Sequence, residues 1–426
     1  MKAEPIDQLP WLEKGQGRLW HLLWITARGK PEPMSILSAL SLTRRPAICF
    51  AIVGLAWGSF AAQVPVFKAA LGASDAQFGV LFLGTALGLG STIWLAPRFD
   101  RLMGGWSMPL AAVMLASAML LPGLMTVPVI FFLTMALVGT CSGLLDVVMN
   151  ARVSEFEAAH NRSLMNANHG VFSLAYAVGA MLTGVAREIG LPPVAVFGIL
   201  WVVIATLSLR VYLPSAAIAH DEGDGPAAGF PWRIVLICGG IVLVAFGVEA
   251  TVETWSALHI ERTLGGRAAE GAFGPAVLGL TMAFGRFSGQ VIAGRFSETG
   301  VITLGSLMAA AGALVAAAAP TPGLAYLGFG TMGLGISVVG PMGLALVGRL
   351  VRPGWRTAAV ARAAVIGFMG FMAAPALMGL MSGAFGLRMA YVAVALLALI
   401  GPALALVIRG RAQAQFPSKS AGTSRS

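Results

Sequence analysis

Two long stretches without charged side chains constrain the fold of this chain more than any other feature. Between Arg101 and Arg152 the only charged residue is Asp146, and between Glu298 and Arg349 there is none. Each stretch holds about 50 residues, whereas one crossing of a bilayer takes about 20 apolar residues. A Pro-Gly pair near the centre of each stretch is typical of a turn. Each stretch therefore predicts two membrane-spanning helices joined by a short loop.

The same criterion applied to the whole chain predicts an all-α polytopic membrane protein with 12 transmembrane helices. The 426 residues are 57% hydrophobic and only 11% charged, whereas soluble domains carry roughly 25% charged residues. A transmembrane barrel is excluded because no segment alternates between apolar and polar residues at period two. The spans are predicted near residues 46–66, 77–96, 106–122, 127–150, 165–187, 192–213, 233–258, 271–293, 300–319, 323–346, 358–382 and 388–409.

The predicted spans fall into two sets of six. An N-terminal tail, residues 1–45, precedes a first six-helix bundle at residues 46–213. A linker rich in Gly, Ala and Pro follows at residues 214–232. The second six-helix bundle occupies residues 233–409, and residues 410–426 form a C-terminal tail.

An internal repeat relates the two predicted bundles. The sequence APRF at residues 96–99 recurs as AGRF at residues 293–296, each time just after an even-numbered span. Arg152 and Arg349 share the same offset, which is close to the spacing of the two charge-free stretches. Matching motifs with matching topology indicate a parallel duplication of six helices.

The 28 Lys and Arg residues are distributed unevenly over the predicted loops. With both termini cytoplasmic, 22 lie on the inner side, five lie in outer loops and Arg286 lies within a span. This asymmetry obeys the positive-inside rule. We therefore predict a multi-pass protein of the cell inner (plasma) membrane with both termini in the cytoplasm. The net charge of +10 is then a signal of topology, and no nucleic-acid partner is predicted.

The loop after the second span carries a recognisable motif. Residues 96–105 read APRFDRLMGG, and this segment resembles the best-known signature of the major facilitator superfamily, G-x-x-x-D-R-x-G-R-R. Asp100 and Arg101 match the signature, whereas Ala96 replaces its first glycine and the trailing basic pair is missing. The resemblance implies a major facilitator fold, in which two six-helix bundles rock around a central cavity. It also implies that Asp100 and Arg101 act in gating by latching the outward-facing state.

Helices four, five, seven and eight carry a narrower likeness. Residues 143–150 (GLLDVVMN), Glu157 and residues 169–173 (HGVFS) are similar to the pattern G-x-x-D-V-x-M-N…E…H-x-x-F-S of the rhizopine-transporter-like branch of the superfamily. Residues 249–256 (EATVETWS) look like the branch's E-G-A-x-x-D-W-S, and residues 285–289 (GRFSG) resemble its G-R-x-x-G. Most members of that branch have no assigned substrate, so the likeness implies a transporter without naming its solute.

Polar and ionisable side chains inside the predicted spans are the candidates for a solute or proton site, because such groups are costly in hydrocarbon and usually line a water-filled path. Asp146 and Asn150 are four residues apart and share one face of the fourth helix. Glu249 and Glu253 share a face of the seventh helix in the same way. The full set predicted for substrate binding and proton coupling is Asp146, Asn150, His169, Ser173, Glu249, Glu253, Trp255 and Arg286.

Several of these residues also have a purely structural interpretation, which the sequence leaves open. Asp146 also suits a hydrogen bond with a neighbouring helix, and Arg286 a static ion pair with an acid. His169 fits a helix cap near the headgroups, and Glu253 fits a wetted position near the outer interface. Trp255 fits an interfacial anchor, the commonest role of Trp near a helix end.

The sequence thus predicts a proton-coupled secondary transporter that acts as a monomer on a small polar solute, such as a sugar-, inositol- or amine-like compound. The proton gradient is its predicted driving force, and neither a cofactor nor a metal is predicted. Two alternatives remain: a multidrug or lipid efflux protein (flippase), and a non-transporting membrane sensor with a transporter fold. An enzyme is not predicted, because the chain lacks a metal-binding cluster, a nucleophile elbow and a phosphate-binding glycine loop beside a lysine.

Overall fold

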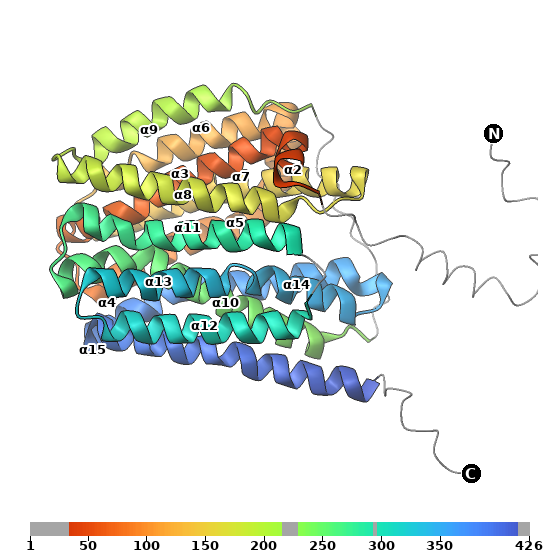
Figure 1. The fold of residues 1–426 in the computed structure, drawn as a ribbon. Helices are drawn as coiled ribbons and strands as arrows, with labels where there is room; N and C mark the ends of the chain where they lie inside the picture. Colours follow the sequence, from red (N-terminus) through yellow and green to blue (C-terminus); the bar gives the residue numbers. More distant parts are fainter. Residues whose placement is uncertain (1–33, 215–228, 293–295, 416–426) are drawn as a thin grey trace, which may run out of the picture.

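The computed structural model describes residues 34–214, 229–292 and 296–415, and these ranges consist of helices and short turns without strands (Figure 1). Outside the described residues lie 1–33 of the predicted N-terminal tail, 215–228 of the predicted linker, 293–295 of the repeated motif and 416–426 of the predicted C-terminal tail. The all-α class predicted from the sequence is therefore confirmed for the described part of the chain.

The first half of the molecule, as we use the term, runs from α3 to α9, with a short helix α2 before it. Its helices are α2 (Ile36–Leu42), α3 (Arg44–Ala70), α4 (Asp75–Leu81), α5 (Leu83–Met103), α6 (Ser107–Met119), α7 (Pro128–His160), α8 (Met165–Glu188) and α9 (Pro193–Ser208). Two 3₁₀ turns, η2 (Gly104–Trp106) and η3 (Pro122–Leu124), join helices within it. The predicted turn at Pro122-Gly123 is thus a short 3₁₀ segment.

The second half runs from α10 to α15. Its elements are α10 (Trp232–Leu258), the π-helical turn η4 (His259–Thr263), α11 (Ala268–Ile292), α12 (Glu298–Ala318), α13 (Pro322–Ile336), α14 (Val339–Leu350), η5 (Pro353–Trp355) and α15 (Arg356–Gln415). One residue inside α15, Gly386, is not helical and has φ 81° and ψ 162°. Only glycine adopts this conformation without strain, so Gly386 is the junction between the last two predicted spans.

These helices account for the 12 predicted spans within the described ranges. Eight segments are long and apolar enough to cross a membrane, and two of them, Asp75–Leu124 and Ala358–Ile408, contain 50 and 51 residues and hold two crossings each. The shorter apolar helix α9 and the 25-residue helix α11 complete the set.

Several boundaries differ from the predicted ones, among them the end of the fourth span, since α7 continues to His160 and not to residue 150. The second span is divided into α4 and α5, and the tenth is divided into α13 and α14. Residues 36–42, assigned to the tail, form α2, whose N-terminus is capped by Ser35. Helix α15 continues to Gln415, beyond the predicted end at residue 409. These breaks and extensions lack a strong local signal, because apolar periodicity alone does not locate helix ends.

Glycines on α5 allow this helix to pack very closely against α7. A Cβ atom on Gly84 would lie 2.3 Å from the carbonyl oxygen of Phe132, and one on Gly88 would lie 1.9 Å from that of Ala136. Such distances are far below van der Waals contact, so any larger residue would force the helices apart.

The two halves meet mainly through α8 against α11 and through α4 against α15, with further contacts between α3 and both α10 and α11. We call the end of the bundle where α3 begins and α15 finishes the proximal end, and the opposite end, where α3 ends and α4 begins, the distal end (Figure 1). Helices α3, α8 and α10 all run from the proximal to the distal end.

Candidate functional site

A buried guanidinium connects the two halves in the middle of the bundle. Arg286 on α11 donates from Nη1 to Ser173 Oγ at 2.5 Å and from Nη2 to Glu249 Oε1 at 3.1 Å. Ser173 lies on α8 of the first half, and Glu249 lies on α10 of the second. The side chains of Arg286 and Glu249 are only 9% and 6% exposed. The structure therefore brings three of the predicted site residues into one hydrogen-bonded bridge.

The Ser173 hydroxyl is oriented by its own helix, since it donates to the backbone carbonyl of His169 at 3.0 Å. It is consequently left to accept the hydrogen bond from Arg286. The His169 imidazole packs edge-on against Phe50 of α3, with ring centroids 4.9 Å apart and planes at 70°. His169 is thus placed beside the bridge, inside the bundle, and not at an exposed helix start.

Asp146 and Asn150 lie on α7 and contact each other. The Asn150 amide donates to Asp146 Oδ1 at 3.1 Å and to the Asp146 backbone oxygen at 2.8 Å. Both residues are half-buried. Within the described residues Asp146 makes no hydrogen bond to another helix. The hydrogen bond to a neighbouring helix that the sequence left open for Asp146 is therefore not observed.

Glu253 and Trp255 occupy different environments on α10. Glu253 is half-buried and interacts electrostatically with Glu249 and Arg286. Trp255 is fully buried and packs edge-on against Phe78 of α4, with ring centroids 6.2 Å apart. An interfacial anchor would be exposed at one edge, so Trp255 instead belongs to the contact between the two halves.

At the proximal end, Asp100 forms a buried ion pair that the sequence did not reveal. Arg152 on α7 binds Asp100 Oδ1 through Nη2 at 2.6 Å, and the two side chains are 1% and 0% exposed. Arg101, its predicted partner in gating, is exposed. In the second half the repeat-related Arg349 pairs with Glu298 at 2.7 Å, but Arg349 is 61% exposed. The shared offset of Arg152 and Arg349 was the one sequence signal for these pairs.

We expect Asp100→Ala to lower the free energy of unfolding by about 1.5–3 kcal/mol, because it removes a charged hydrogen bond to the buried Arg152, which keeps Glu155 as another ion partner. The repeat-related Glu298→Ala is the matched control and is expected to cost about 1 kcal/mol or less, since Arg349 is exposed. Thermal or denaturant unfolding of the purified variants measures both. If both variants lost the same free energy of unfolding, burial would not be the reason that the Arg152–Asp100 pair stabilises the fold.

At the distal end, ion pairs join the two halves. Arg187 at the end of α8 binds Glu261 in η4 through two hydrogen bonds, 2.7 and 2.9 Å long, and also donates to the carbonyl oxygen of Ala62 at 2.6 Å. The next residue in η4, Arg262, forms a bidentate pair with Asp75 at the start of α4. We call the four charged residues Arg187, Glu261, Arg262 and Asp75 the distal lock.

Two further side chains contact the Asp75 carboxylate. Lys68 on α3 lies 3.0 Å from its Oδ1 atom, and Ser382 on α15 donates to its Oδ2 atom. A third pair between the halves, Arg267 with Glu188 at 3.6 Å, lies on the exposed rim.

Among the described residues, the pairs Arg187–Glu261, Arg262–Asp75 and Arg267–Glu188 join the halves at the distal end. The proximal pairs Arg152–Asp100 and Arg349–Glu298 each stay within one half. These ion pairs therefore hold the two halves together at the distal end. An alternating-access protein requires such an arrangement in one of its states.

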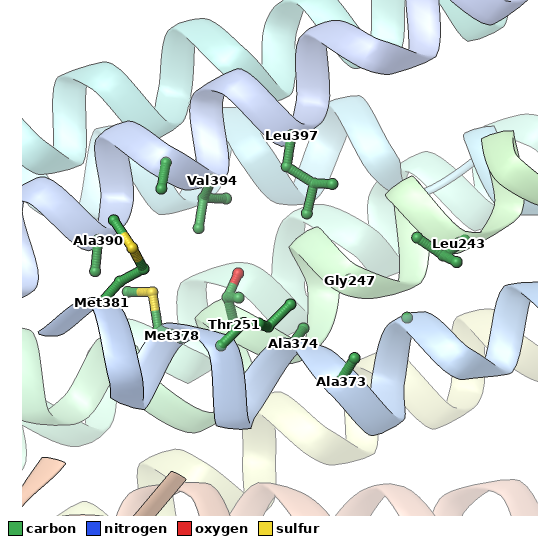
Figure 2. Close-up of a pocket in the computed structure, with 13 residues that line it drawn as sticks. Leu243, Gly247, Thr251, Ala373, Ala374, Met378, Met381, Ala390, Val394 and Leu397 are labelled. Atoms are coloured by element: carbon green, nitrogen blue, oxygen red, sulfur yellow. The ribbon is translucent and has the colours of Figure 1, made fainter. Parts of the chain in front are cut away.

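A separate cavity of about 270 Å³ lies within the second half, between α10 and the two helical parts of α15 (Figure 2). Leu243, Gly247 and Thr251 contribute from α10, and Met378 and Val394 from α15 (Figure 2). The Thr251 hydroxyl donates to the Val248 carbonyl of its own helix, so its proton is already used. None of the predicted site residues lines this apolar cavity.

No protein-family profile matches the chain. It is, however, 31% identical over 364 residues to an uncharacterized MFS-type transporter of Yersinia pestis, across 83% of this chain and 92% of the relative. The chain belongs to the major facilitator superfamily. Among curated relatives of this transporter, an uncharacterized transporter of Sinorhizobium fredii is 28% identical, with 84% and 96% coverage, and the membrane protein MosC of Rhizobium meliloti is 26% identical, with 79% and 83% coverage.

Solved structures of the superfamily share the fold. A bacterial homologue of the human lysosomal transporter Spinster, in an inward-facing and unoccupied conformation, aligns with a TM-score of 0.69 and 16% identity, covering 87% of this chain and 96% of its own. The nucleoside transporter NupG aligns with a TM-score of 0.63 and 14% identity, covering 87% of this chain and 98% of its own. These relatives and neighbours are transporters and not enzymes. The protein is a multi-pass membrane transporter.

Proposed function

We propose that this transporter moves a small polar solute of the sugar, inositol or amine type by alternating access, driven by the proton gradient. The observation that carries the proposal is the buried bridge in which Arg286 binds Ser173 of one half and Glu249 of the other. A guanidinium has five donors in a planar fork, and burying its charge is costly unless partners use those donors. The bridge therefore couples a polar binding site to the relative position of the halves.

The bridge supplies donors and acceptors that a solute can use. When the halves rock, Ser173 moves away from Arg286, because the two residues belong to different halves. The Nη1 donor that now binds Ser173 is then available to a hydroxyl or carboxylate of the solute. Asp146 and Asn150 on the opposite half offer further acceptors and donors.

Two carboxylates are suited to carry protons. Among the described residues the Asp146 carboxylate is hydrogen-bonded by the amide of Asn150 alone, and Glu253 interacts electrostatically with Arg286, which already binds Glu249. An acid without its own counter-charge inside a bundle binds a proton as an alternative to an ion partner. One such acid on each half suits a cycle in which protonation accompanies solute movement.

We also propose a location in the inner membrane with cytoplasmic termini, a branch of the superfamily and a monomeric state. With the distal end outward, the basic residues follow the positive-inside rule, which supports the inner membrane and cytoplasmic termini. The motifs at residues 143–150 and 249–256 support the rhizopine-transporter-like branch, and the likeness to MosC agrees with it. A monomer is proposed, since the two halves complete the fold within one chain.

The test is uptake by the purified protein in proteoliposomes. A thermal-shift screen against polyols, amino sugars and organic acids first identifies a solute, because a ligand of the folded state raises the melting temperature. An inward proton gradient is then expected to raise the initial uptake rate about tenfold, and Asp146→Asn to remove this dependence. Uptake that is independent of pH in the wild type and in both Asp146→Asn and Glu249→Gln would rule out proton coupling.

The apolar cavity of Figure 2 favours a second candidate function, the export of lipids or apolar drugs. A largely apolar lining suits an acyl chain better than a polyol. Movement of labelled phospholipids between leaflets of the same proteoliposomes distinguishes the two functions. Lipid movement without uptake of any polar solute would replace our proposal with this one.

A further inference from the structure

An arginine near the proximal end of α15 lies on aromatic side chains. The guanidinium carbon of Arg362 is 4.0 Å from the centre of the Phe230 ring and 5.3 Å from that of Trp232. Trp355 packs edge-on against Phe230, with ring centroids 5.2 Å apart. Contacts of this kind occupy the flat face of a guanidinium and leave the N–H groups at its edge available. Among the described residues Arg362 makes no hydrogen bond or ion pair, so no side chain or carbonyl there uses these donors.

This arginine lies at the depth of the lipid headgroups. Arg362 is exposed and is the fifth residue of the apolar segment Ala358–Ile408, and Trp232 is the first residue of the segment Trp232–Thr263. Tryptophan is enriched at the boundary between hydrocarbon and water, and an arginine near the end of a span extends its charge to the same boundary. The aromatic rings therefore fix the guanidinium at the level where the phosphate groups of the bilayer lie.

The surroundings of Arg362 are positively charged. Two further exposed arginines, Arg233 and Arg356, directly follow tryptophans of this aromatic cluster in the sequence. Arg356 donates from Nε to the carbonyl oxygen of Gly348 at 2.9 Å. Residues 229–248 contain no Asp or Glu, and none follows Glu298 in the whole sequence. An anionic headgroup is therefore complementary in charge to this part of the proximal end.

An exposed apolar stripe continues from Arg362 along α15 towards the distal end. Met369, Ala373 and Leu380 follow Arg362 by 7, 11 and 18 residues, and all three are exposed. These spacings place them on the same helix face as Arg362. At 1.5 Å per residue, Ala373 lies about 17 Å from Arg362 along the axis, and one leaflet of the hydrocarbon core is about 15 Å thick. The stripe thus extends from the headgroups to the centre of the bilayer.

The stripe meets the apolar cavity of Figure 2 at Ala373, which lines that cavity. Leu377 lines the cavity too and is exposed, so the cavity of about 270 Å³ opens on this face of α15. Small residues leave the space, among them Gly247 on α10 and Ala374 and Ala390 on the two parts of α15 (Figure 2). An acyl chain gains free energy by burial in such a cavity and needs no polar partner there.

We propose that Arg362 and this cavity form one binding site for an anionic phospholipid. The Arg362 guanidinium holds the phosphate, and one acyl chain follows the stripe and ends in the cavity. The lipid is a resident ligand and not a transported one. It fills the space between α10 and the two parts of α15, and so it stabilises the packing of the second half. This inference goes beyond the proposed transport of a polar solute, which does not require the lipid.

The test measures lipid binding to the full chain in detergent, by native mass spectrometry and by the melting temperature. The probes are phosphatidylglycerol, the neutral phosphatidylcholine, and glycerol phosphate, which has a headgroup without acyl chains. Phosphatidylglycerol is expected to bind and to raise the melting temperature of the wild type. Arg362→Gln should weaken this binding about tenfold, because charge-assisted hydrogen bonds to the phosphate are lost. Arg210→Gln, at another exposed arginine, is the control and should bind as wild type does.

A second variant tests the acyl chain separately. Ala373→Phe places a ring at the mouth of the cavity and is expected to weaken the binding of phosphatidylglycerol about tenfold, because part of the chain loses its buried position. Its matched control is Ala384→Phe, since Ala384 is exposed on the same helix but does not line the cavity. Both positions are exposed, so the lipid-free melting temperatures should match the wild type.

Three results would overturn the inference. They are equal binding of the two phospholipids by the wild type, unchanged binding by Arg362→Gln or Ala373→Phe, and stabilisation by glycerol phosphate as large as that by phosphatidylglycerol. The last result would assign a soluble phosphate compound in place of a lipid. None of these assays involves transport, so uptake of a polar solute that persists beside such a failure would leave the proposed function standing.

Discussion

Replacing Arg286 by methionine is expected to reduce solute transport at least about 100-fold, since each of its two charge-assisted hydrogen bonds contributes about 1.5–3 kcal/mol. The substitution also leaves Glu249 buried without a counter-charge, which costs about 3–5 kcal/mol of stability. Lysine should not rescue transport, because a single ammonium cannot reach Ser173 and Glu249 with the geometry of the planar fork. Initial uptake rates and melting temperatures measured on the same preparations separate the two effects.

The double variant Arg286→Met/Glu249→Gln decides between a functional and a structural bridge. It removes both buried charges, so much of the lost stability is expected to return. Transport is expected to remain absent, because the donors for the solute are gone. Arg210→Lys, a conservative change at an exposed position just after α9, is the control and should transport normally. A double variant that transports at the wild-type rate would show that the bridge is structural only.

The second large effect concerns the distal lock. Glu261 and Arg262 are adjacent residues of opposite charge in the π-helical turn η4, and each binds a residue of the other half. We expect Glu261→Gln/Arg262→Gln to shift the transporter towards a distal-open state. If each lost pair contributes about 1.5 kcal/mol, the equilibrium moves by roughly 100-fold.

Spin labels on Ala70 of α3 and Ala268 of α11 report this shift, because they lie at the distal end of the two halves. The longer distance should become populated in the double variant and stay rare in wild type. Arg267→Gln removes a rim pair that is 3.6 Å long and 74% exposed on the arginine side, so it should change little. Identical distance distributions in wild type and double variant would mean that the lock does not govern opening.

The π-helical form of η4 offers a reason for placing both charges on one turn. A π-turn carries an extra residue relative to an α-helix and often marks a functional position. Because it presents Glu261 and Arg262 to partners on two different helices, α8 and α4, a rearrangement of this one turn would release both pairs together.

The candidate site was only partly predictable. Asp146, Glu249 and Arg286 stood out because charges in apolar spans are rare, and their roles stay predictions until transport is measured. Tyr176 gave no such signal, since a tyrosine in an apolar helix is ordinary. Its hydroxyl is buried and has no hydrogen-bond partner among the described residues, and only the packing of α8 against α11 creates this arrangement.

The all-α class, the number of spans and the duplication follow from the order of the amino acids alone. A bilayer admits only helices of a minimum apolar length, so charge-free stretches such as residues 102–145 and 299–348 leave few alternatives. Which charges meet is set by the tertiary structure. Arg187 and Glu261 lie in separate predicted outer loops, and from the sequence each is expected to be solvated. They form an ion pair because the two halves meet at the distal end. Ion pairs depend on separations of a few ångströms between distant segments, and no local pattern in the chain encodes those separations.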